Sequence, residues 1–352
     1  MFTISLCMIV KNEEKVIARL LDCAKQFADE IIIVDTGSTD KTKEIAKNYT
    51  DKIYDFKWCD DFSKARNFSF SKATCDYQMW LDADDFVSQQ NIQKILELKQ
   101  SKETKIDVYM FKYSTGFDAN NTPFLTYFRE RLLKRTDCFK WEGFVHEAIA
   151  PFGKIEYLDI EIKHRKNANN KDGKRNLNLY RKAIKRGEKF NAREMYYYSR
   201  ELYYNNYISS AIKNLKKFLK MKNSYPPDNY GAYVLLSDCL LLKNQIDSSL
   251  STLFACLQNH TPTAELCCKI GHIFDIKKEK ERAIFWYKSA LSCPKQTTGF
   301  VKETYSNITP FLELTKLLYP INYQEAKTYH QKAKTTSPNH PSVLFNEKFF
   351  KD

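Results

Sequence analysis

The sequence predicts an α/β domain with a mostly parallel sheet, followed by an all-α region of paired helices. Two observations carry this prediction. Over residues 1–110, short β-branched runs alternate with stretches of helical period, the order expected of βαβ units. From residue 176 onward, strand-like runs disappear and apolar residues recur at helical spacing.

The first region places polar residues directly after apolar strands. Its expected strands are 4–10, 30–34, 51–56 and 77–81, and its expected helices are 13–27, 41–48 and 63–73. The continuous apolar runs at 4–10 and 30–34 are typical of a parallel sheet covered on both faces. Such sheets bind ligands beyond the carboxyl ends of their strands, so the residues after each strand are the first candidates for a site.

The second region contains a degenerate repeat. Small residues recur at similar intervals, at Ala211, Ser248, Ala283 and Ala326. The clearest unit is 268–294, in which Gly271, Phe274, Ala283, Tyr287 and Ala290 fall at tetratricopeptide-like offsets. The prediction is a tetratricopeptide-like solenoid of about four units, with an ordinary helical bundle as the alternative.

Composition limits the class of protein. The chain has 352 residues, of which 43% are hydrophobic, enough for two or three domains with cores of their own. None of the 10 cysteines forms a CxxC pair, and most lie in apolar segments. The expectation is a reduced, cytoplasmic bacterial protein without a zinc site or disulfide framework. The N-terminal apolar run is too short for a membrane span and lacks the features of a signal peptide.

The positive charge is concentrated in one segment. Residues 160–225 contain 18 Lys and Arg against 5 Asp and Glu, which equals the formal net charge of +13 for the whole chain. The segment is either a solvated helical face or a surface that faces an anion such as a sugar nucleotide. No nucleic-acid-binding module is recognised, so no nucleic-acid partner is expected.

The stretch WLDADDF, residues 80–86, follows the expected fourth strand. Residues i and i+2 of a strand share a face, so Asp82 and Asp84 are expected on one side. Two such carboxylates can hold a divalent cation, Mg²⁺ or Mn²⁺. Asp85 is expected on the other side, capping the next segment or facing solvent. A lone pair of this kind is equally typical of a solvated turn.

Three further blocks accompany this stretch: Cys7-Met-Ile-Val-Lys-Asn-Glu-Glu14, Ile31-Ile-Ile-Val-Asp-Thr-Gly-Ser-Thr-Asp40 and Asp61-Phe-Ser-Lys-Ala-Arg-Asn67. In order and spacing, the four blocks resemble the family 2 glycosyltransferases. The resemblance implies a Rossmann-like GT-A fold and a nucleotide-sugar donor. It also implies that Asn12, Glu13 and Asp35 line the base and ribose pocket and that Arg66 and Asn67 support the nucleotide.

The same resemblance assigns the metal and the base. It implies that Asp82 lies near the ribose and the metal, and that Asp84 is the principal metal ligand. In the later block Trp141-Glu-Gly-Phe-Val-His-Glu147, it implies catalytic roles for His146 and Glu147, with a structural histidine and a surface acid as the alternatives. His164 is the implied third metal ligand, although the residues after it depart from the family pattern.

The expected function is that of an inverting, metal-dependent glycosyltransferase. A hexose or HexNAc would pass from a UDP-sugar to Cys, Ser or Thr of a peptide or protein, as in the similar S/O-glycosyltransferases of glycocin bacteriocins such as sublancin. The expected domains are 1–170, with core blocks in 1–90 and an acceptor half in 91–170, and a helical domain at 171–352 that is a candidate dimer interface. The alternatives are a cell-surface glycan or lipid-linked acceptor, and a non-catalytic peptide-binding module.

Overall fold

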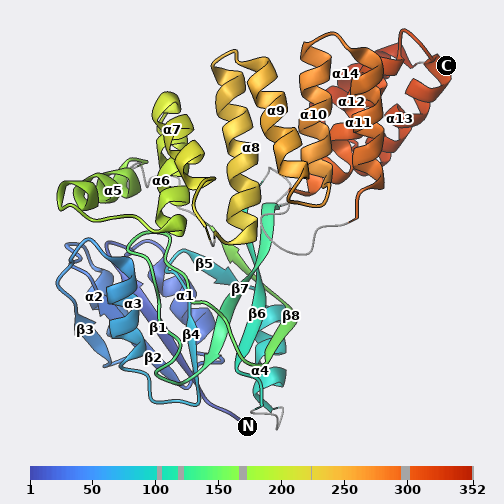
Figure 1. Ribbon diagram of the computed structural model, residues 1–352. Coiled ribbons are helices and arrows are strands. Elements are labelled where there is room, and N and C mark those ends of the chain that lie inside the picture. The colour runs from blue at the N-terminus through green and yellow to red at the C-terminus, as the bar shows by residue number, and fades with distance from the viewer. Residues whose placement is uncertain (101–104, 118–122, 166–172, 223, 295–301, 351–352) are drawn as a thin grey trace. The chain divides into compact units, whose positions relative to one another are not determined.

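The computed structural model describes residues 1–100, 105–117, 123–165, 173–222, 224–294 and 302–350. The chain forms two compact units, Met1–Lys189 and Phe190–Asp352. Figure 1 shows strands in the first unit and only helices in the second. The α/β class followed by an all-α region is therefore confirmed. The boundary of the first unit lies beyond residue 170, because the helix α5 (Arg175–Lys185) belongs to this unit.

An eight-stranded mixed sheet forms the centre of the first unit. Its order is β3-β2-β1-β4-β7-β6-β8-β5. The strands are β1 (Ile4–Val10), β2 (Glu30–Asp35), β3 (Ile53–Asp55), β4 (Tyr77–Trp80), β5 (Asp85–Val87), β6 (Val108–Phe117), β7 (Pro123–Lys134) and β8 (Ile155–His164). The first four are mutually parallel, as predicted. β7 joins β4 in the antiparallel direction, and β8 pairs parallel with β6 and antiparallel with β5.

Helices cover both faces of this sheet. They are α1 (Ile17–Ala24), α2 (Thr42–Ala46), α3 (Phe62–Phe70) and α4 (Gln89–Gln100). The side chains of β1 alternate between two apolar clusters. Leu6 and Met8 pack with residues of α1 and α4, whereas Cys7 packs with Phe70 of α3 and with Trp141. Burial on both faces explains why the first two strands read as continuous apolar runs.

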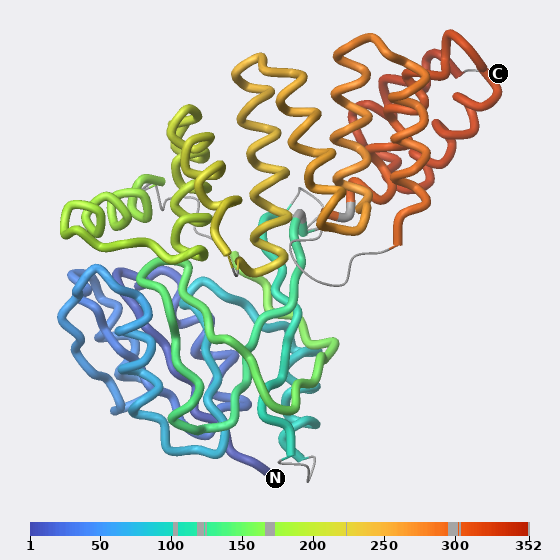
Figure 2. The backbone as a smooth tube through the Cα atoms, viewed as in Figure 1, coloured from blue at the N-terminus to red at the C-terminus, as the bar shows by residue number. Residues whose placement is uncertain are grey.

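The second unit is a series of helical hairpins (Figure 2). The helices are α6 (Ala192–Tyr204), α7 (Ile208–Phe218), α8 (Pro226–Leu242), α9 (Ile246–Leu257), α10 (Ala264–Ile276), α11 (Lys280–Ser292), α12 (Ile308–Leu318), α13 (Tyr323–Thr336) and α14 (Pro341–Asn346). The described residues thus form four hairpins, α6–α7, α8–α9, α10–α11 and α12–α13, followed by α14. This matches the predicted number of repeat units.

Three of the hairpins share the same turn. A residue with positive φ occupies the middle of each three-residue loop, at Asn206, Asn244 and Lys278. The residue after it returns its backbone N–H to the helix, as Glu279 does to the carbonyl of Phe274. This is the Schellman pattern, which ends a helix and reverses the chain.

Small residues let the paired helices approach closely. Ala211, Ala283 and Ala326 are buried, each at the fourth position of its helix. The equivalent position of α9 is Ser249, which is buried and bonded to Ser237. The repeat predicted from the sequence assigned this position to Ser248, one residue earlier, and Ser248 is exposed.

Candidate active site

The loops after β1 and β2 are joined at the carboxyl edge of the sheet. The side-chain carbonyl of Asn12 accepts the backbone N–H of Thr39 at 2.8 Å, and the backbone N–H of Asn12 donates to Ser38 Oγ at 2.9 Å. Asn12 has a φ of 56°, a conformation that asparagine tolerates better than most residues. It therefore shapes the wall of the predicted nucleotide pocket by holding two loops together.

Asp35, the last residue of β2, is buried, and one of its two carboxylate oxygens accepts hydrogen bonds from described residues. Its Oδ1 accepts the backbone N–H groups of Gly37 and Ser38, both at 2.8 Å. Its Oδ2 is buried and has no hydrogen-bond partner among the described residues. A buried acceptor without a partner is costly, so this oxygen is suited to receive a donor group from a ligand.

Asp82 and Asp84, which follow β4, lie in a turn and not in a strand, and Asp85 begins β5. β4 ends at Trp80, and the backbone N–H of Asp85 donates to the carbonyl of Asp82 at 2.9 Å. In return, the N–H of Asp82 donates to Asp85 Oδ2 at 3.0 Å. The expectation that Asp82 and Asp84 share a strand face is therefore wrong, because the strand alternation ends before them.

Asp85 is the centre of a buried polar network. Its side chain is fully buried, which corrects the expectation of a capping or solvent-facing residue. It accepts Tyr113 Oη at 3.1 Å and Arg131 Nη1 at 3.2 Å, and it lies 3.0 Å from His164 Nδ1. The network joins β5, β6, β7 and β8, so Asp85 fixes the position of groups from four strands.

Arg131 neutralises this buried carboxylate from β7. Its side chain is 0% exposed, and it also donates to the carbonyl of Trp80 at 3.0 Å. Its guanidinium carbon lies 3.6 Å from the ring centroid of Trp80 and 4.2 Å from that of Tyr113. Nε and Nη2 have no hydrogen-bond partner within the described part of the chain, so the aromatic faces supply their environment.

His164, the last residue of β8, lies between two of the aspartates. Its Nδ1 is 3.0 Å from Asp85 Oδ1 and 3.2 Å from Asp84 Oδ1. Burial alone would lower the pKa of His164, but the carboxylates of Asp85 and Asp84 raise it above its usual value. The structure thus brings His164 together with the Asp82–Asp85 turn, as the sequence predicted.

The group suits a divalent cation. Ligand atoms of Asp82, Asp85 and His164 all lie within 4.8 Å of one another. Carboxylate oxygens with one imidazole form a donor set that Mn²⁺ and, for the oxygens, Mg²⁺ accept. Asp85 takes the place of Asp84 in this three-residue group, while Asp84 lies next to it through His164.

Glu13 adds a further carboxylate to the same corner. Burial raises the pKa of Glu13 to about 7, and the charges of Asp84 and Asp82 raise it in the same direction. The pKa of Asp84 is also raised, first by burial and then by Asp82 and Asp85 against the opposing effect of His164. Raised pKa values in neighbouring carboxyl groups indicate an excess of negative charge, which a bound cation would relieve.

Arg66 connects the aspartate turn to the predicted base. It donates from Nη2 to Asp82 Oδ1 at 2.7 Å and from Nε to Glu147 Oε1 at 2.5 Å. Its guanidinium carbon lies 5.0 Å and 4.7 Å from the ring centroids of Trp80 and Trp141. Burial opposes ionisation of Asp82, but Arg66 and Arg131 hold its pKa well below the usual value. Asp82 and Glu147 are therefore joined by one arginine.

The loop that carries Glu147 is fixed by Asn67. The Asn67 amide donates to the carbonyl of Trp141 at 2.9 Å and accepts its backbone N–H at 2.9 Å. Glu142 and Ala148 then pair across the loop, and His146 has a φ of 54°. Asn67 thus positions the loop. His146 is partly buried beside Glu147, and its catalytic role stays a prediction.

Sequence reasoning missed Asp85, Arg131 and Tyr113 as parts of this site. Asp85 was discounted by strand alternation, and the other two lie in long strands with no flanking motif. The available signal was weak: a buried arginine in an apolar strand, Glu130-Arg-Leu-Leu133, needs a buried acid as its partner. Two aromatic residues of β6, Phe111 and Tyr113, are buried.

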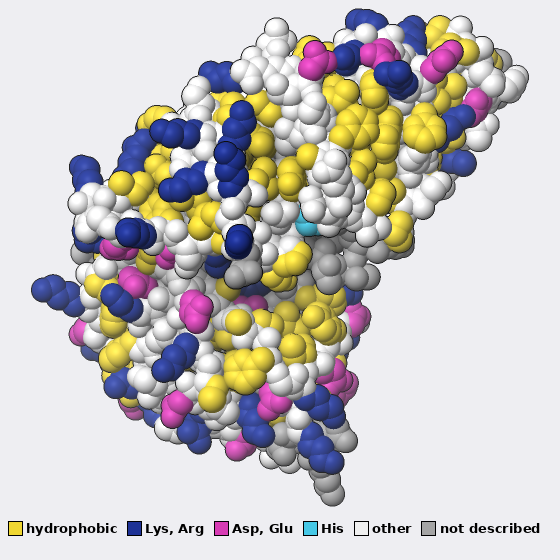
Figure 3. Space-filling view, in the orientation of Figure 1, with side chains coloured by type: hydrophobic (Ala, Val, Ile, Leu, Met, Phe, Trp, Pro, Cys, Tyr) yellow, Lys and Arg dark blue, Asp and Glu magenta, His cyan; other side chains and the backbone are white. Residues whose placement is uncertain are grey.

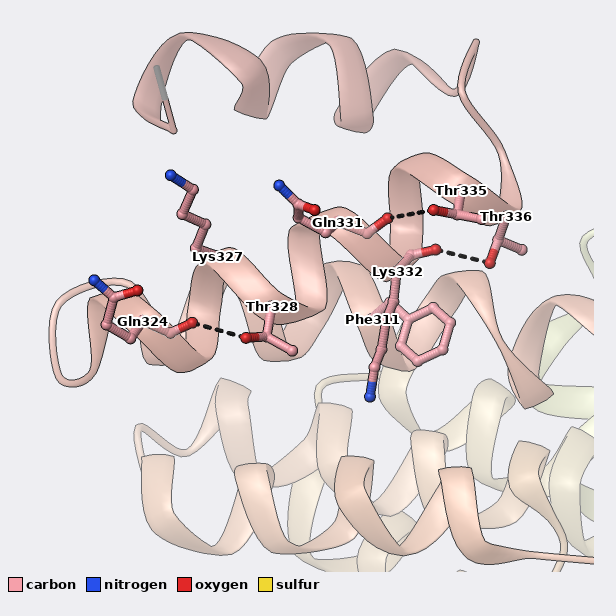
Figure 4. A pocket seen from close by; sticks show the side chains of 8 residues that line it. All are labelled: Phe311, Gln324, Lys327, Thr328, Gln331, Lys332, Thr335 and Thr336. Carbon is pink, nitrogen blue, oxygen red and sulfur yellow. Dashed lines mark hydrogen bonds between the residues drawn. The ribbon is translucent and has the colours of Figure 1, made fainter. Parts of the chain in front are cut away.

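A second concave feature lies in the helical unit (Figure 4). It is a shallow hollow lined by Phe311, Gln324, Lys327, Thr328, Gln331, Lys332, Thr335 and Thr336. Its threonine hydroxyls donate to the carbonyl four residues earlier on α13, as Thr335 does to Gln331. The hollow has no acidic side chain in its lining, so the candidate active site is the carboxylate corner of the first unit.

Comparison with known families agrees with this geometry. Residues 5–154 match the model of glycosyl transferase family 2. The match spans β1 to β4, the aspartate turn and the loop of Glu147. This part of the chain is similar to the glycosyltransferase domains of family 2.

Curated relatives extend the similarity. The SPbeta prophage-derived glycosyltransferase SunS of Bacillus subtilis is 31% identical over 262 residues, 69% of this chain and 60% of SunS. A TPR repeat-containing protein of Synechococcus elongatus is 45% identical over 85 residues, 24% of this chain and 21% of that protein. The chain thus spans about a fifth to three fifths of the length of these relatives.

Solved structures with weaker similarity are helical repeat proteins. MamA matches with a TM-score of 0.39 and 19% identity over 47% of this chain and 90% of MamA. Pseudomonas aeruginosa pilF matches with a TM-score of 0.41 and 16% identity over 50% of this chain and 74% of pilF. Among the described residues, no helix is both long enough and apolar enough to cross a membrane.

Proposed function

We propose that this chain is an inverting, metal-dependent glycosyltransferase that moves a hexose or HexNAc from a UDP-sugar to a peptide or protein. The observation that carries the proposal is the corner formed by Asp82, Asp85 and His164, next to Asp84 and Glu13. It lies at the carboxyl edge of the strands in a family 2 domain, where nucleotide ligands of α/β sheets bind.

The donor is held by the loops after β1, β2 and β4. Asp35 Oδ2 accepts a hydroxyl or imide N–H of the nucleoside, which supplies the partner that this buried oxygen lacks among the described residues. Asn12 and Glu13 form the neighbouring wall, and Asn67 acts through the loop that it fixes.

The diphosphate lies at the acidic corner with a divalent cation, Mg²⁺ or Mn²⁺. The side chains that would hold the cation are those of Asp82, Asp84, Asp85 and His164. When bound, it neutralises the charge that develops on the leaving diphosphate. Without a cation, a diphosphate beside these carboxylates would be repelled.

Glu147 is the proposed base. It accepts the proton of the acceptor thiol or hydroxyl as the sulfur or oxygen bonds to the anomeric carbon. The bond from that carbon to the diphosphate oxygen breaks on the opposite side, and UDP leaves with the electron pair. Arg66 holds Glu147 in its present orientation, and His146 lies next to it in the loop.

The acceptor is proposed to be Cys, Ser or Thr of a polypeptide. The support is the fusion of a family 2 domain to paired helices, an architecture suited to binding extended chains. We assign transfer to residues 1–170, with acceptor selection in 91–170, and peptide binding or dimer formation to 171–352. The enzyme is proposed to act in the bacterial cytoplasm.

Mass spectrometry of a reaction mixture tests this function. The protein is incubated with UDP-glucose or UDP-GlcNAc, Mn²⁺ and the precursor peptides encoded near its gene. The expected result is one hexose or HexNAc added to a peptide, lost with Glu147→Gln and retained with Asp137→Asn, an exposed acid on the same unit. Two results together would contradict the peptide acceptor: hydrolysis of the donor without any peptide product, and transfer to lipid-linked or cell-surface glycans. The acceptor would then be a glycan.

A further inference from the structure

Helix α7 presents an unusual cationic face. Lys213, Lys216 and Lys217 of α7, with Lys220 in the turn directly after its C-cap Leu219, are all exposed and lie at intervals of three, four and seven residues, which places the three helical lysines on one face with Lys220 close behind. We call these four residues the lysine stripe. The opposite face, with Ile208, Ala211, Leu215 and Phe218, is buried in the hairpin. The stripe therefore faces away from the core of its own unit.

The stripe has no acidic counterpart within the described part of the second unit. Residues 205–222 contain no Asp or Glu, and none of the four lysines forms an ion pair with a described carboxylate. Acids on the adjoining helices are engaged elsewhere: Glu194 caps α6, Asp228 is buried near Arg193, and Asp238 pairs with Lys269. Figure 3 shows dark-blue side chains gathered over the region of α7 with little magenta among them.

This arrangement opposes the stability of the helix. Lys213 and Lys217 are like charges four residues apart within α7, a spacing that is unfavourable in a helix, and Lys216 and Lys220 add two more positive charges at its C-terminal end. Some other exposed lysines of the same unit have acidic partners, for example Lys288 with Glu325 and Lys334 with Glu347. A row of charges without internal compensation is suited to an external anion.

We propose that the lysine stripe adsorbs the protein to an anionic lipid surface. Three of the charges project from the exposed face of α7 and the fourth from the turn after it, which presents them together to an external surface. All four are lysines, which act as point charges in a diffuse field, whereas arginine suits shaped, bidentate recognition of single groups. The stripe has no exposed aromatic ring between its charges, because Phe218 is buried, so it offers no stacking platform for bases.

Exposed tyrosines flank the helix at both ends. Tyr204 and Tyr207 precede α7 and are 65% and 39% exposed, and Tyr225 follows it at 62% exposed. Tyrosine prefers the headgroup level of a bilayer, where its ring is apolar and its hydroxyl is hydrated. Because the apolar face of α7 is buried, binding is by adsorption and does not require insertion of the helix.

Vesicle flotation of the full chain tests the proposal without any sugar transfer. The probes are phosphatidylcholine vesicles and vesicles with about 30% phosphatidylglycerol, an anionic lipid, at ~0.1 M salt. The expected result is flotation with the anionic vesicles alone, reversed by high salt. Replacing all four lysines by glutamine should weaken binding more than about tenfold, since each lysine near an anionic surface contributes measurably.

A matched control separates the stripe from net charge. Lys47, Lys57, Lys140 and Lys154 are exposed lysines of the first unit, and their replacement by glutamine removes the same charge. This variant should float like the unmodified protein. The stripe variant should keep its helical circular dichroism, because the substitutions remove repulsion between like charges.

Three results would overturn the proposal. One is equal loss of flotation in both quadruple variants, which would indicate net charge and not the stripe. Another is no flotation of the unmodified protein at low salt. The third is displacement of bound protein by polyglutamate or duplex DNA with higher affinity than vesicles, which would make a polyanionic macromolecule the partner.

Discussion

Both units of this chain bury acidic side chains, Asp228 and Glu265 among them in the second unit, but the first unit joins its buried acids and arginines in one network. The first unit buries Arg131 and Asp85 completely and places Arg66, Asp82, Glu147 and His164 around them. The second unit buries mainly alanine, leucine and cysteine and repeats one turn three times. The helical unit gains stability from repetition, whereas the sheet unit retains charges whose desolvation is unfavourable. Such retention is expected where the charges bind a ligand.

The largest effect is expected from Asp84→Ala on sugar transfer. Asp84 lies beside His164 and contributes to the negative potential at Glu13, but the core network of Asp85 does not depend on it. We expect activity to fall at least ~10³-fold, as for loss of a group that stabilises charge in a transition state. The folded protein should be as stable as before, because a raised pKa indicates a carboxyl group in an unfavourable position. Initial rates measure the sugar-transfer activity, and urea unfolding measures the stability. Activity within about tenfold of that of the original protein would contradict a role for Asp84 at the cation site.

Arg131→Met should reduce stability in the first unit. The substitution leaves the carboxylate of Asp85 buried without its cation, a loss that typically costs about 3–5 kcal/mol. Urea unfolding followed by tryptophan fluorescence reports on it, since Trp80 contacts Arg131. The double variant Arg131→Met with Asp85→Leu should recover part of the loss. A cost below about 1 kcal/mol for the single variant would mean that the pair is not a buried unit.

Glu13→Gln should change the pH dependence of stability. The pKa of Glu13 is raised to about 7 in the folded state from 4.5, so the folded state binds a proton that the unfolded state releases. The contribution of Glu13 to the free energy of unfolding is complete below pH 4.5 and is lost as the pH rises through 7. The glutamine variant should therefore be more stable than the original protein at pH 8 by about 1–2 kcal/mol, after allowance for solvent screening.

Thermal unfolding with and without Mg²⁺ adds a second test of the same residue. Adding the cation should raise the unfolding temperature of the original protein more at pH 8 than at pH 5. At pH 8, protons compete less with the cation for Glu13 and its neighbours. An equal gain at both pH values would separate Glu13 from the cation site.

The smallest expected effect concerns the repeated turn of the second unit. Lys278 has a φ of 63°, a region that glycine adopts without strain, so Lys278→Gly should be neutral or stabilising by up to about 1 kcal/mol. Lys277, its neighbour, has a φ of −74°, and Lys277→Gly should destabilise by a similar amount. Unfolding monitored by helical circular dichroism compares them. The same sign for both variants would show that the turn geometry does not control this hairpin.

Much of the fold follows from local pattern. The runs at 4–10 and 30–34 form the predicted parallel strands because they are buried on both faces, and the small residues of the repeats lie where helices meet. The strands after β4 were harder to predict. β7 pairs with β4, and β8 pairs with β5 and β6, which are partners far along the chain, and no short-range pattern specifies those registers.

In the candidate site too, local motifs were predicted from the sequence, whereas contacts that depend on tertiary packing were not. Asp82, Asp84 and His164 were brought together from motif and order, and the structure places them in one corner. The role of Asp85 could not be read from the sequence, because a tight turn at 82–85 replaces the strand alternation on which the reasoning depended. The link from Arg66 to both Asp82 and Glu147 is equally a product of tertiary packing.

The central claim is that the aspartate turn and His164 form a cation-dependent nucleotide site. Calorimetric titration of Mn²⁺ into the protein, with and without UDP, tests it most directly. The account predicts one cation per chain, tighter binding in the presence of UDP, and loss of that binding in Asp82→Asn and Asp84→Ala but not in Asp137→Asn. Equal Mn²⁺ and UDP binding in all of these proteins would contradict it.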